Sequence, residues 1–477
     1  MNYQNNKYTG KHTAGLVAVS IFLAVLISVQ SACAADWPTY RLDNARSGAT
    51  PEALVLSELN QAWVYSAPSP PKRAWGDDPP WDAWSYNGAV PMRDFDAALF
   101  VTVVGEEVFF GSSVTNSVHC LNAINGLQKW FYRVDGAVRF PPSYANGKLY
   151  FGSDDGYVHC INAADGSFVW KYSPMGESRV LFNNGNFTTM WPVRTGTAVM
   201  DEKVYFAAGL VPWESSYLCS VDALTGSASG TGLYKNTVSS TPTGAILASA
   251  TKLYLTEGRF KPICYDRTSG GGAVTIGVGA GVFALLTSDG PSEGYVFGTG
   301  RFSAHGYRLE SYGDRIASQA DGKYMVVGEG FSYVITESFN VETVKGYKTN
   351  MVHNLKAIDR SDGSELWSVV CNTRCFDIVL ADDTIFVGGV SEVAAHSTVD
   401  GSVLWSKPVN GQVRGLAVAN SSLFASTDTG KIYMFGSPFL QSDFNKSGMV
   451  DLVDLMTLMN NFLDCTDPLT AGCYEAN

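Results

Sequence analysis

Short runs of apolar residues, separated by turn residues, recur along residues 147–170, where the chain reads GKLYFGSDDGYVHCINAADGSFVW. Leu149 and Phe151 lie two positions apart, as do Val158 and Cys160, and this period of two predicts β-strands rather than helices. The pairs Asp155-Gly156 and Asp165-Gly166 supply turns with positive φ. The segment therefore predicts a four-stranded antiparallel meander.

The same pattern returns along the chain. VHCLNAINGLQKW (118–130) and VHCINAADGSFVW (158–170) differ in their charges but share the apolar, Asn-Ala, Gly and Trp positions. Repetition at this spacing indicates a repeat architecture, in which each unit buries its sheet faces against its neighbours. Eight units can be traced, at residues 107–130, 147–170, 202–226, 252–272, 294–313, 323–367, 384–405 and 422–436.

The last unit lacks the strand that carries the tryptophan. The pentapeptide QAWVY at 61–65 holds Trp63 and Tyr65 at the spacing of Trp130 and Tyr132. We therefore expect residues 61–65 to complete the last sheet and close a ring, which removes exposed sheet edges. The expected fold is an all-β, eight-bladed β-propeller.

A family resemblance supports this fold. A sequence motif recurs at residues 123–130, 163–170 and 357–367: it begins with Ala, continues with Asn or Asp, and ends with Gly and then Trp. This motif resembles the repeat of quinoprotein-like, or PQQ-like, β-propellers. The stretch DWPTYRLDNARSG (36–48) is similar to the leader that precedes the first blade in secreted bacterial members. The resemblance implies one propeller over residues 36–437. The units between 252 and 313 lack the Trp, so the number of blades is least well defined by the sequence in that region.

Enzymes of this family use a bound quinone with a calcium ion and an Asp base, and the alcohol dehydrogenases add adjacent cysteines near the cofactor. This chain contains no Cys-Cys pair. We therefore favour a non-catalytic binding or scaffold protein and expect no PQQ. The alternative is a PQQ-dependent oxidoreductase of alcohols or sugars.

The N-terminus predicts export. Residues 1–35 contain Lys7 and Lys11, an apolar run over 14–29, and then small residues before Ala35, as in a secretory signal peptide. A lipoprotein anchor at Cys33 is the alternative. The run is 16 residues long, shorter than the ~20 of a membrane helix, so we expect no membrane span after cleavage. The expected location is secreted, periplasmic or at the cell surface.

Charge narrows the partners. The net charge is −12, and no basic stripe occurs, which argues against nucleic acid. A protein or an envelope polysaccharide is the expected partner of a monomeric propeller.

Residues 438–477 predict a second module. Oxygen-bearing residues alternate along a twelve-residue loop, which can wrap one calcium ion, and Gly448 permits the sharp turn. An apolar helix face follows, and the module resembles half of a dockerin or an EF-hand. Its role would be attachment, although it can equally dock on its own propeller, and an Asp/Asn-rich turn capping a helix would give the same pattern. The expected calcium ligands are Asp443, Asn445, Ser447, Met449 through its carbonyl, Asp451 and Asp454.

The cysteines fall into two groups. Four occupy equivalent strand positions in successive units, too far apart to bond, and are expected to be small core residues. Two further pairs are close enough in sequence to form disulfides in an oxidising compartment. The first group is Cys120, Cys160, Cys219 and Cys264, and the pairs are Cys371 with Cys375 and Cys465 with Cys473.

Two sets of residues are candidates for ligand binding. Arg139, Arg194 and Arg414 precede or begin inner strands, where guanidinium groups directed toward the axis could hold a carboxylated ligand. Pairing of each with a nearby Asp is the structural alternative. The insert at 66–98 carries Trp75, Trp81 and Trp84, which suit stacking on sugar rings or covering the channel. Carbohydrate binding is therefore a third functional hypothesis.

Overall fold

The structure is a computed structural model, and strands make up most of what it describes. A short 3₁₀ helix, η1 (Leu56–Glu58), lies near the N-terminus. No helix in the described part of the chain is long and apolar enough to cross a membrane. The described residues are 35–75, 95–176, 179–211, 213–257, 260–275, 284–287, 295–299, 306–311, 315–320, 322–344 and 347–436, with Leu452 and Met456.

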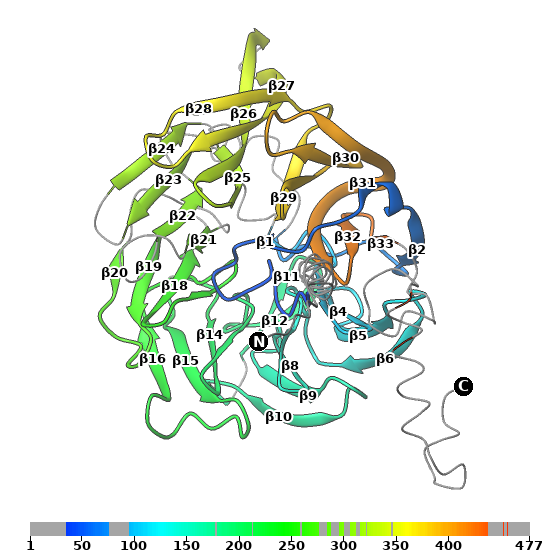
Figure 1. The fold of residues 1–477 in the computed structure, drawn as a ribbon. Coiled ribbons are helices and arrows are strands. Elements are labelled where there is room, and N and C mark those ends of the chain that lie inside the picture. Colours follow the sequence, from blue (N-terminus) through cyan, green and yellow to red (C-terminus); the bar gives the residue numbers. More distant parts are fainter. Residues whose placement is uncertain are drawn as a thin grey trace, which may run out of the picture.

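The sheets are arranged as a ring around a common centre (Figure 1). Six of them have four antiparallel strands in simple meander order, as the repeat predicted. Their strands are β3 (Val101–Val104), β4 (Glu107–Ser112), β5 (Ser117–Asn122) and β6 (Gln128–Arg133); β7 (Ser143–Ala145), β8 (Lys148–Gly152), β9 (Val158–Asn162) and β10 (Phe168–Tyr172); β13 (Ala198–Met200), β14 (Lys203–Ala208), β15 (Ser216–Asp222) and β16 (Tyr234–Val238); β17 (Leu247–Ala248), β18 (Lys252–Glu257), β19 (Phe260–Asp266) and β20 (Val274–Thr275); β21 (Ala284–Thr287), β22 (Tyr295–Thr299), β23 (Gly306–Ser311) and β24 (Arg315–Ala320); and β25 (Gly322–Val327), β26 (Phe331–Val344), β27 (Tyr347–Asp359) and β28 (Glu365–Val370).

A seven-stranded sheet occupies the remaining sector of the ring. Its long strand β31 pairs with β30 near its start and with β32 over Val413–Ala419, so it passes from one group of strands to the next. The strands are β29 (Cys375–Ala381), β30 (Thr384–Ser397), β31 (Val403–Ala419), β32 (Ser422–Thr427) and β33 (Lys431–Phe435), with β1 (Ala49–Thr50) and β2 (Gln61–Ser66) at its two edges.

The N-terminal strand β2 lies beside the last strand of the ring. Trp63 is paired with Met434 and Tyr65 with Ile432, in antiparallel register. The predicted pairing of residues 61–65 with the C-terminal sheet is thereby confirmed. Figure 1 shows blue β2 next to orange β33, although nearly the whole described chain separates them in sequence.

Burial follows the position of a strand within its sheet. Four of the five residues of β8 and of β9 are buried, on both faces of the sheet. The outer strand β6, by contrast, is mostly exposed or half-buried. Sheets packed face to face around a ring cover the middle strands from both sides, so the period of two does not appear there as alternating exposure.

The repeated phrase forms a contact between neighbouring sheets. Trp130 Nε1 donates a hydrogen bond to the carbonyl of Ala163 at 3.1 Å, in the next sheet. Gly166 lies against the ring of Trp130, with a φ of +72° that a residue with a Cβ rarely adopts. The same bond, from an indole Nε1 to a backbone carbonyl, joins Trp63 to Ala123, Trp170 to Ala223, Trp367 to Thr398, and Trp405 to Leu59.

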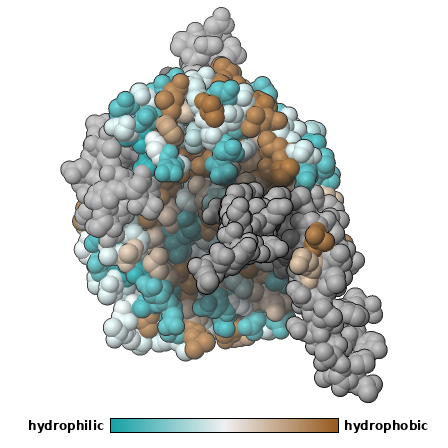
Figure 2. Space-filling view, in the orientation of Figure 1, coloured by the Kyte–Doolittle hydropathy of each residue, from teal (hydrophilic) through white to brown (hydrophobic). Residues whose placement is uncertain are grey.

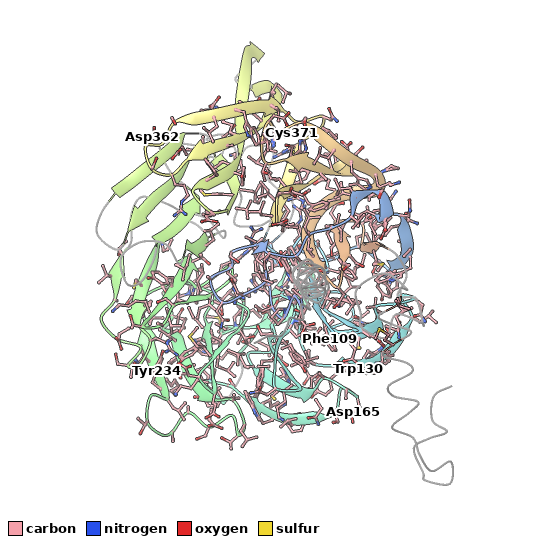
Figure 3. All side chains as sticks on the ribbon, viewed as in Figure 1. Phe109, Trp130, Asp165, Tyr234, Asp362 and Cys371 are labelled. Atoms are coloured by element: carbon pink, nitrogen blue, oxygen red, sulfur yellow. The ribbon has the colours of Figure 1, made fainter. Side chains whose placement is uncertain are left out.

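Figure 3 illustrates the same contact in space. Phe109 and Trp130 lie near each other, with ring centroids 5.9 Å apart, and Asp165 lies on the outer rim beside the turn that Gly166 closes. The phrase recurs because each copy joins one sheet to the next.

The four cysteines at equivalent positions are buried free thiols, as predicted. Burial raises the pKa of Cys120 and of Cys160 to about 12. Cys120 and Cys160 therefore stay protonated, and all four cysteines are core residues.

Two hairpins depart from the repeat. β11 (Val180–Asn183) and β12 (Asn186–Thr189) form a separate two-stranded sheet between β10 and β13. The hairpin of β26 and β27 extends beyond its sheet as far as the pair Val344 and Tyr347. Over the described part of the face in Figure 2, hydrophilic and hydrophobic residues are interspersed.

Candidate binding site

The N-terminal segment 35–50, here called the leader, lies at the centre of the ring, where Figure 1 shows it in dark blue. Its backbone bonds to the ends of successive inner strands. The pairs are Ala35 with Asn420 after β31, Trp37 with Val103 of β3, Pro38 with Tyr144 of β7, Asn44 with Ala248 of β17, Ala45 with Leu286 of β21, and Gly48 with Leu380 of β29.

Side chains of the leader reach the two inner strands that its backbone does not bond. Asn44 donates from Nδ2 to the carbonyl of Val199 in β13 at 2.8 Å. Arg41 donates from Nη2 to the carbonyl of Met325 in β25 at 3.3 Å, and its Nη1 pairs with Asp377 at 2.7 Å. The leader therefore ties together all the inner strands.

Arg46 is the most heavily bonded side chain of the leader. It is 1% exposed and donates to the carbonyls of Ile246 at 3.0 Å and Thr197 at 2.9 Å, and to Thr39 Oγ1 at 2.9 Å. Burial lowers the pKa of Arg46 to about 10, and Asp43 partly offsets that effect. The guanidinium remains charged at neutral pH and is held by oxygen acceptors.

Two of the predicted arginines meet at one carboxylate. Arg139 Nη2 lies 2.6 Å from Asp154 Oδ2, and Arg194 Nε lies 2.9 Å from Asp154 Oδ1. Arg139 Nη1 also pairs with Asp96 Oδ2, which accepts a further bond from the backbone N–H of Ala74 at 2.7 Å. All four charged side chains are buried. They form an alternating chain of two cations and two carboxylates.

The two carboxylates of this cluster differ in acidity. Burial by itself would raise the pKa of Asp154, but Arg139 and Arg194 outweigh it and hold that pKa well below its ordinary value. For Asp96, burial is the larger effect and raises the pKa, because Arg139 only partly offsets it. Asp154 is therefore the firmly ionised member of the cluster.

Trp75 completes one side of the cluster. The Arg194 guanidinium carbon lies 5.4 Å from the centre of a Trp75 ring, in cation–π geometry. Three buried atoms of these residues have no hydrogen-bond partner within the described part of the chain: Trp75 Nε1, Asp96 Oδ1 and Arg194 Nη1. The structure thus brings three predicted candidates together, Arg139, Arg194 and Trp75.

Arg414 does not join this cluster. Its guanidinium carbon lies 4.2 Å from the centre of the Phe376 ring, and its Nη2 donates to Gln412 Oε1 at 2.6 Å. The structural alternative, pairing with a nearby Asp, is what the structure shows for Arg139 and Arg194.

The predicted disulfide between Cys371 and Cys375 is absent from the structure, in which both are free thiols. Cys375 Sγ lies 3.3 Å from the carbonyl oxygen of Thr373 and also shares a hydrogen bond with Cys371. The pKa of Cys375 is raised well above its ordinary value, mainly by the hydrogen bond with Cys371 and secondly by burial. Figure 3 labels Cys371.

The remaining predicted residues lie outside the described residues. They are Trp81 and Trp84 of the insert, the calcium ligands Asp443, Asn445, Ser447, Met449, Asp451 and Asp454, and the pair Cys465 and Cys473.

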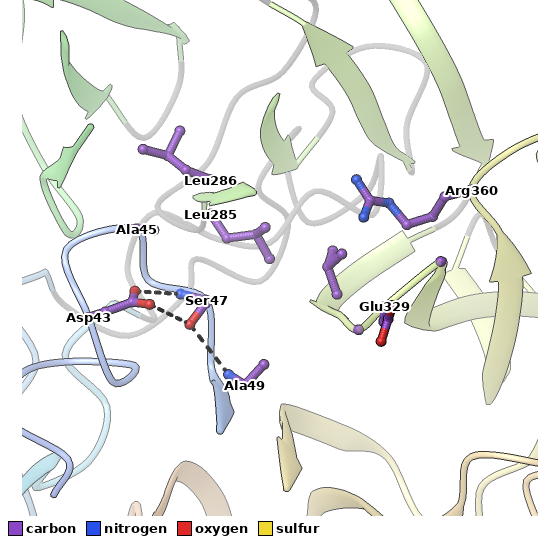
Figure 4. Close-up of a pocket in the computed structure, with 11 residues that line it drawn as sticks. Asp43, Ala45, Ser47, Ala49, Leu285, Leu286, Glu329 and Arg360 are labelled. Carbon is purple, nitrogen blue, oxygen red and sulfur yellow. Dashed lines mark hydrogen bonds between the residues drawn. The ribbon is translucent and has the colours of Figure 1, made fainter. Parts of the chain in front are cut away.

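A cavity of about 490 Å³ opens beside the leader (Figure 4). Its volume is in the range typical of ligand pockets. The leader forms one side, and the turn between β25 and β26 forms another. The lining residues are Asp43, Ala45, Ser47 and Ala49 of the leader, Leu285 and Leu286 of β21, Val327, Gly328, Glu329 and Gly330 at the end of β25, and Arg360.

Sequence reasoning missed both the leader's central position and this cavity. The leader resembled a family segment, but its bonds to inner strands join residues far apart in sequence. One signal was available: a polar segment with two arginines, Arg41 and Arg46, and few apolar residues precedes the first repeat. Such a segment is expected to bond to backbone groups rather than to fill an apolar core.

The described residues do not fit a quinone held beside calcium. Arg139 and Arg194 are engaged by Asp154. Within the described ranges, no three or more His, Cys, Asp or Glu side chains are grouped so that they could hold a metal ion. We therefore derive no chemistry through that cofactor.

Comparisons with known proteins agree with the fold. The family model described as outer membrane protein assembly factor BamB matches residues 73–228 and 353–436, about half of the chain. No curated protein sequence matches significantly.

Solved structures share the fold at low sequence identity. The quinohemoprotein alcohol dehydrogenase from Comamonas testosteroni has a TM-score of 0.61 and 13% identity, over 87% of this chain and 82% of that chain. A europium-containing methanol dehydrogenase has a TM-score of 0.56 and 12% identity, over 84% of this chain and 98% of that chain. Identities this low support a common architecture and nothing more specific. With the family model covering half of the sequence, this chain belongs to the PQQ-like propeller family described as outer membrane protein assembly factor BamB.

Proposed function

We propose that this chain is a non-catalytic propeller that acts as a binding or scaffold protein. The observation that carries the proposal is the pairing of buried arginines with buried carboxylates, which neutralise one another. Arg139 and Arg194 both bond to Asp154, and Arg41 pairs with Asp377. Side chains held in such pairs stabilise the ring. The groups available to bind a partner are then those of its surface and loops.

The proposal includes eight blades in a closed ring. The six four-stranded sheets would supply six of them, and the seven-stranded sheet would supply two, divided within β31. In support, β31 exchanges its partner β30 for β32 along its length. The pairing of β2 with β33 would then complete the eighth blade.

The location and attachment form a further part of the proposal. Residues 1–35 would direct the chain to the cell surface, the periplasm or the exterior, and the loop from Asp443 to Asp454 would bind calcium. Residues 438–477 would then attach the propeller to a protein or an envelope polysaccharide. The residue pattern of the loop supports this part, which rests on the sequence.

Two experiments on the full mature chain test the proposal. Envelope extract is passed over the immobilised protein with calcium and again with a chelator, and a partner released by the chelator is the expected result. In parallel, purified protein is mixed with PQQ and calcium and assayed for cofactor absorbance and for dye reduction with alcohols or aldose sugars. We expect neither signal.

Stoichiometric PQQ uptake with substrate-dependent dye reduction would replace this proposal with the oxidoreductase alternative. A partner that remains bound in chelator would retain the binding role but remove calcium from it.

A further inference from the structure

The cavity beside the leader lies where the leader backbone leaves an inner strand uncovered. On either side of β25, the ends of the inner strands β21 and β29 are met by leader backbone, through Ala45 and Gly48. At β25, the described contact of the leader is made by the side chain of Arg41, which donates to the carbonyl of Met325. The cavity opens beyond this contact, at Val327.

The neighbouring contacts show which chemistry fits such a strand end. Leu286 donates its N–H to the carbonyl of Ala45, and Leu380 donates to the carbonyl of Gly48. In addition, Ala49 and Thr50 run parallel to β29 as β1. The groups that meet inner strand ends on this face are therefore backbone carbonyls of the leader, and β1 adds an extended segment at β29. An added strand gains affinity from such main-chain bonds.

The walls of the cavity suit small apolar side chains. Ala45, Ala49, Val327, Leu285 and Leu286 supply its apolar lining. Glu329, an exposed residue between Gly328 and Gly330, and Arg360 bring opposite charges to it. In Figure 4 the side chain of Arg360 extends from the side opposite the leader toward Leu286. A peptide with apolar residues flanked by polar ones matches this lining.

We propose that this cavity binds an extended segment of a partner protein, whose backbone pairs with the end of β25 as the leader pairs with the neighbouring strands. Small apolar side chains of the segment lie against Leu285, Leu286 and Val327. The inference deepens the proposed binding function and rests on it.

Selection of a peptide-displaying phage library on the immobilised full-length protein tests this site. Enriched peptides are synthesised and their affinities measured by calorimetry on three forms of the protein. Val327→Phe fills the cavity. Val104→Phe is the matched control, because Val104 is also a half-buried residue that ends an inner strand, β3, but does not line the cavity. We expect at least a tenfold loss of affinity for Val327→Phe and less than a twofold change for Val104→Phe.

A backbone test separates pairing from apolar contact alone. The best peptide is resynthesised with ester linkages in place of its central amides, which weakens its carbonyl acceptors and removes N–H donors, and we expect at least a tenfold loss of affinity. If Val327→Phe does not fold, Glu329→Trp blocks the cavity from an exposed turn. Failure to enrich any peptide, equal binding by both Phe variants, or undiminished binding after ester replacement would overturn the inference. The chelator-sensitive partner of the proposed function would survive any of these results.

Discussion

At the scale of single residues, Asp154 is the carboxylate that holds two buried arginines, Arg139 and Arg194. It is 2% exposed and accepts hydrogen bonds from both Arg139 and Arg194. A buried guanidinium without its carboxylate is far more costly than an exposed one, because water cannot replace the lost partner. The cluster is therefore sensitive to the loss of this one charge.

Replacement of Asp154 by Asn should lower the free energy of unfolding by about 3–5 kcal/mol, because it leaves two buried cations against one remaining carboxylate. Urea denaturation followed by tryptophan fluorescence measures the change. Glu107→Gln is the control, since Glu107 pairs with Lys129 on the surface and should cost less than about 1 kcal/mol. Equal effects of the two substitutions would mean that the buried cluster is not stabilising.

The pH dependence of stability follows from the same residue. The pKa of Asp154 is lowered in the folded state, so its contribution is complete above the unfolded pKa of about 4 and is lost as the pH falls toward the folded value. Asp96 has a raised pKa and acts in the opposite sense, losing its contribution as the pH rises. The stability difference between wild type and Asp154→Asn should therefore shrink by about 1 kcal/mol between pH 6 and pH 3. A difference that grows toward pH 3 would reverse the assigned sign.

At the scale of the structural element, the sheets are joined by the indole-to-carbonyl contact of the repeated phrase. Gly166 and Gly147 provide a matched pair, because their φ values are +72° and +73°. A Cβ at Gly166 would lie 2.6 Å from the Trp130 ring, whereas a Cβ at Gly147 would meet nothing within 4 Å.

Gly166→Ala should therefore destabilise the protein by about 1–3 kcal/mol more than Gly147→Ala, since the two share their backbone strain and differ in the clash with Trp130. Thermal and urea unfolding of the two variants measure the difference. Equal midpoints would show that this contact between sheets contributes no net stability.

Much of the element level follows from sequence alone. The repeat locates the strands, and the spacing of Trp63 and Tyr65 identifies the strand that pairs with β33. Each of these features is carried by residues near one another in the chain. The meeting of Arg139 and Arg194 at Asp154 depends on loops of different sheets, and the position of the leader depends on the finished ring. Neither leaves a local pattern.

The cysteines illustrate the same limit. Burial of Cys120 and its equivalents follows from their place in the repeat. Proximity of Cys371 and Cys375 in sequence predicts a disulfide, and in the structure the two are free thiols that share a hydrogen bond, with Cys375 Sγ also 3.3 Å from the carbonyl oxygen of Thr373. Spacing alone does not distinguish these two outcomes.

At the scale of the whole molecule, the C-terminal loop predicts calcium binding by the full chain. Asp443→Ala should abolish calcium binding in calorimetry, because it removes the first ligand of the loop. Asp165→Ala, in an exposed turn on the ring, is the control and should leave binding unchanged. Because Asp454 stands where an EF-hand has a bidentate Glu, we expect weak affinity, with a Kd of about 10⁻⁵–10⁻³ M. Calcium binding retained in Asp443→Ala would place the ion elsewhere.

The whole ring also depends on the leader, which connects inner strands of the six four-stranded sheets and of the seven-stranded sheet. The N–H of Trp37 donates to Val103, and the N–H groups of Arg46 and Gly48 donate within the leader, to Asp43 and Arg41. These amide protons exchange only when the leader unfolds from the centre of the ring. The leader should therefore be among the slowest-exchanging parts of the molecule, despite its place near the N-terminus.

Hydrogen exchange of the mature protein, followed by mass spectrometry, tests this claim most directly. We predict that peptides covering residues 36–50 exchange as slowly as those covering the buried strands β8 and β14. Complete exchange of residues 36–50 within seconds, as expected for the exposed turn at residues 224–225, would contradict the central position of the leader and the account built on it.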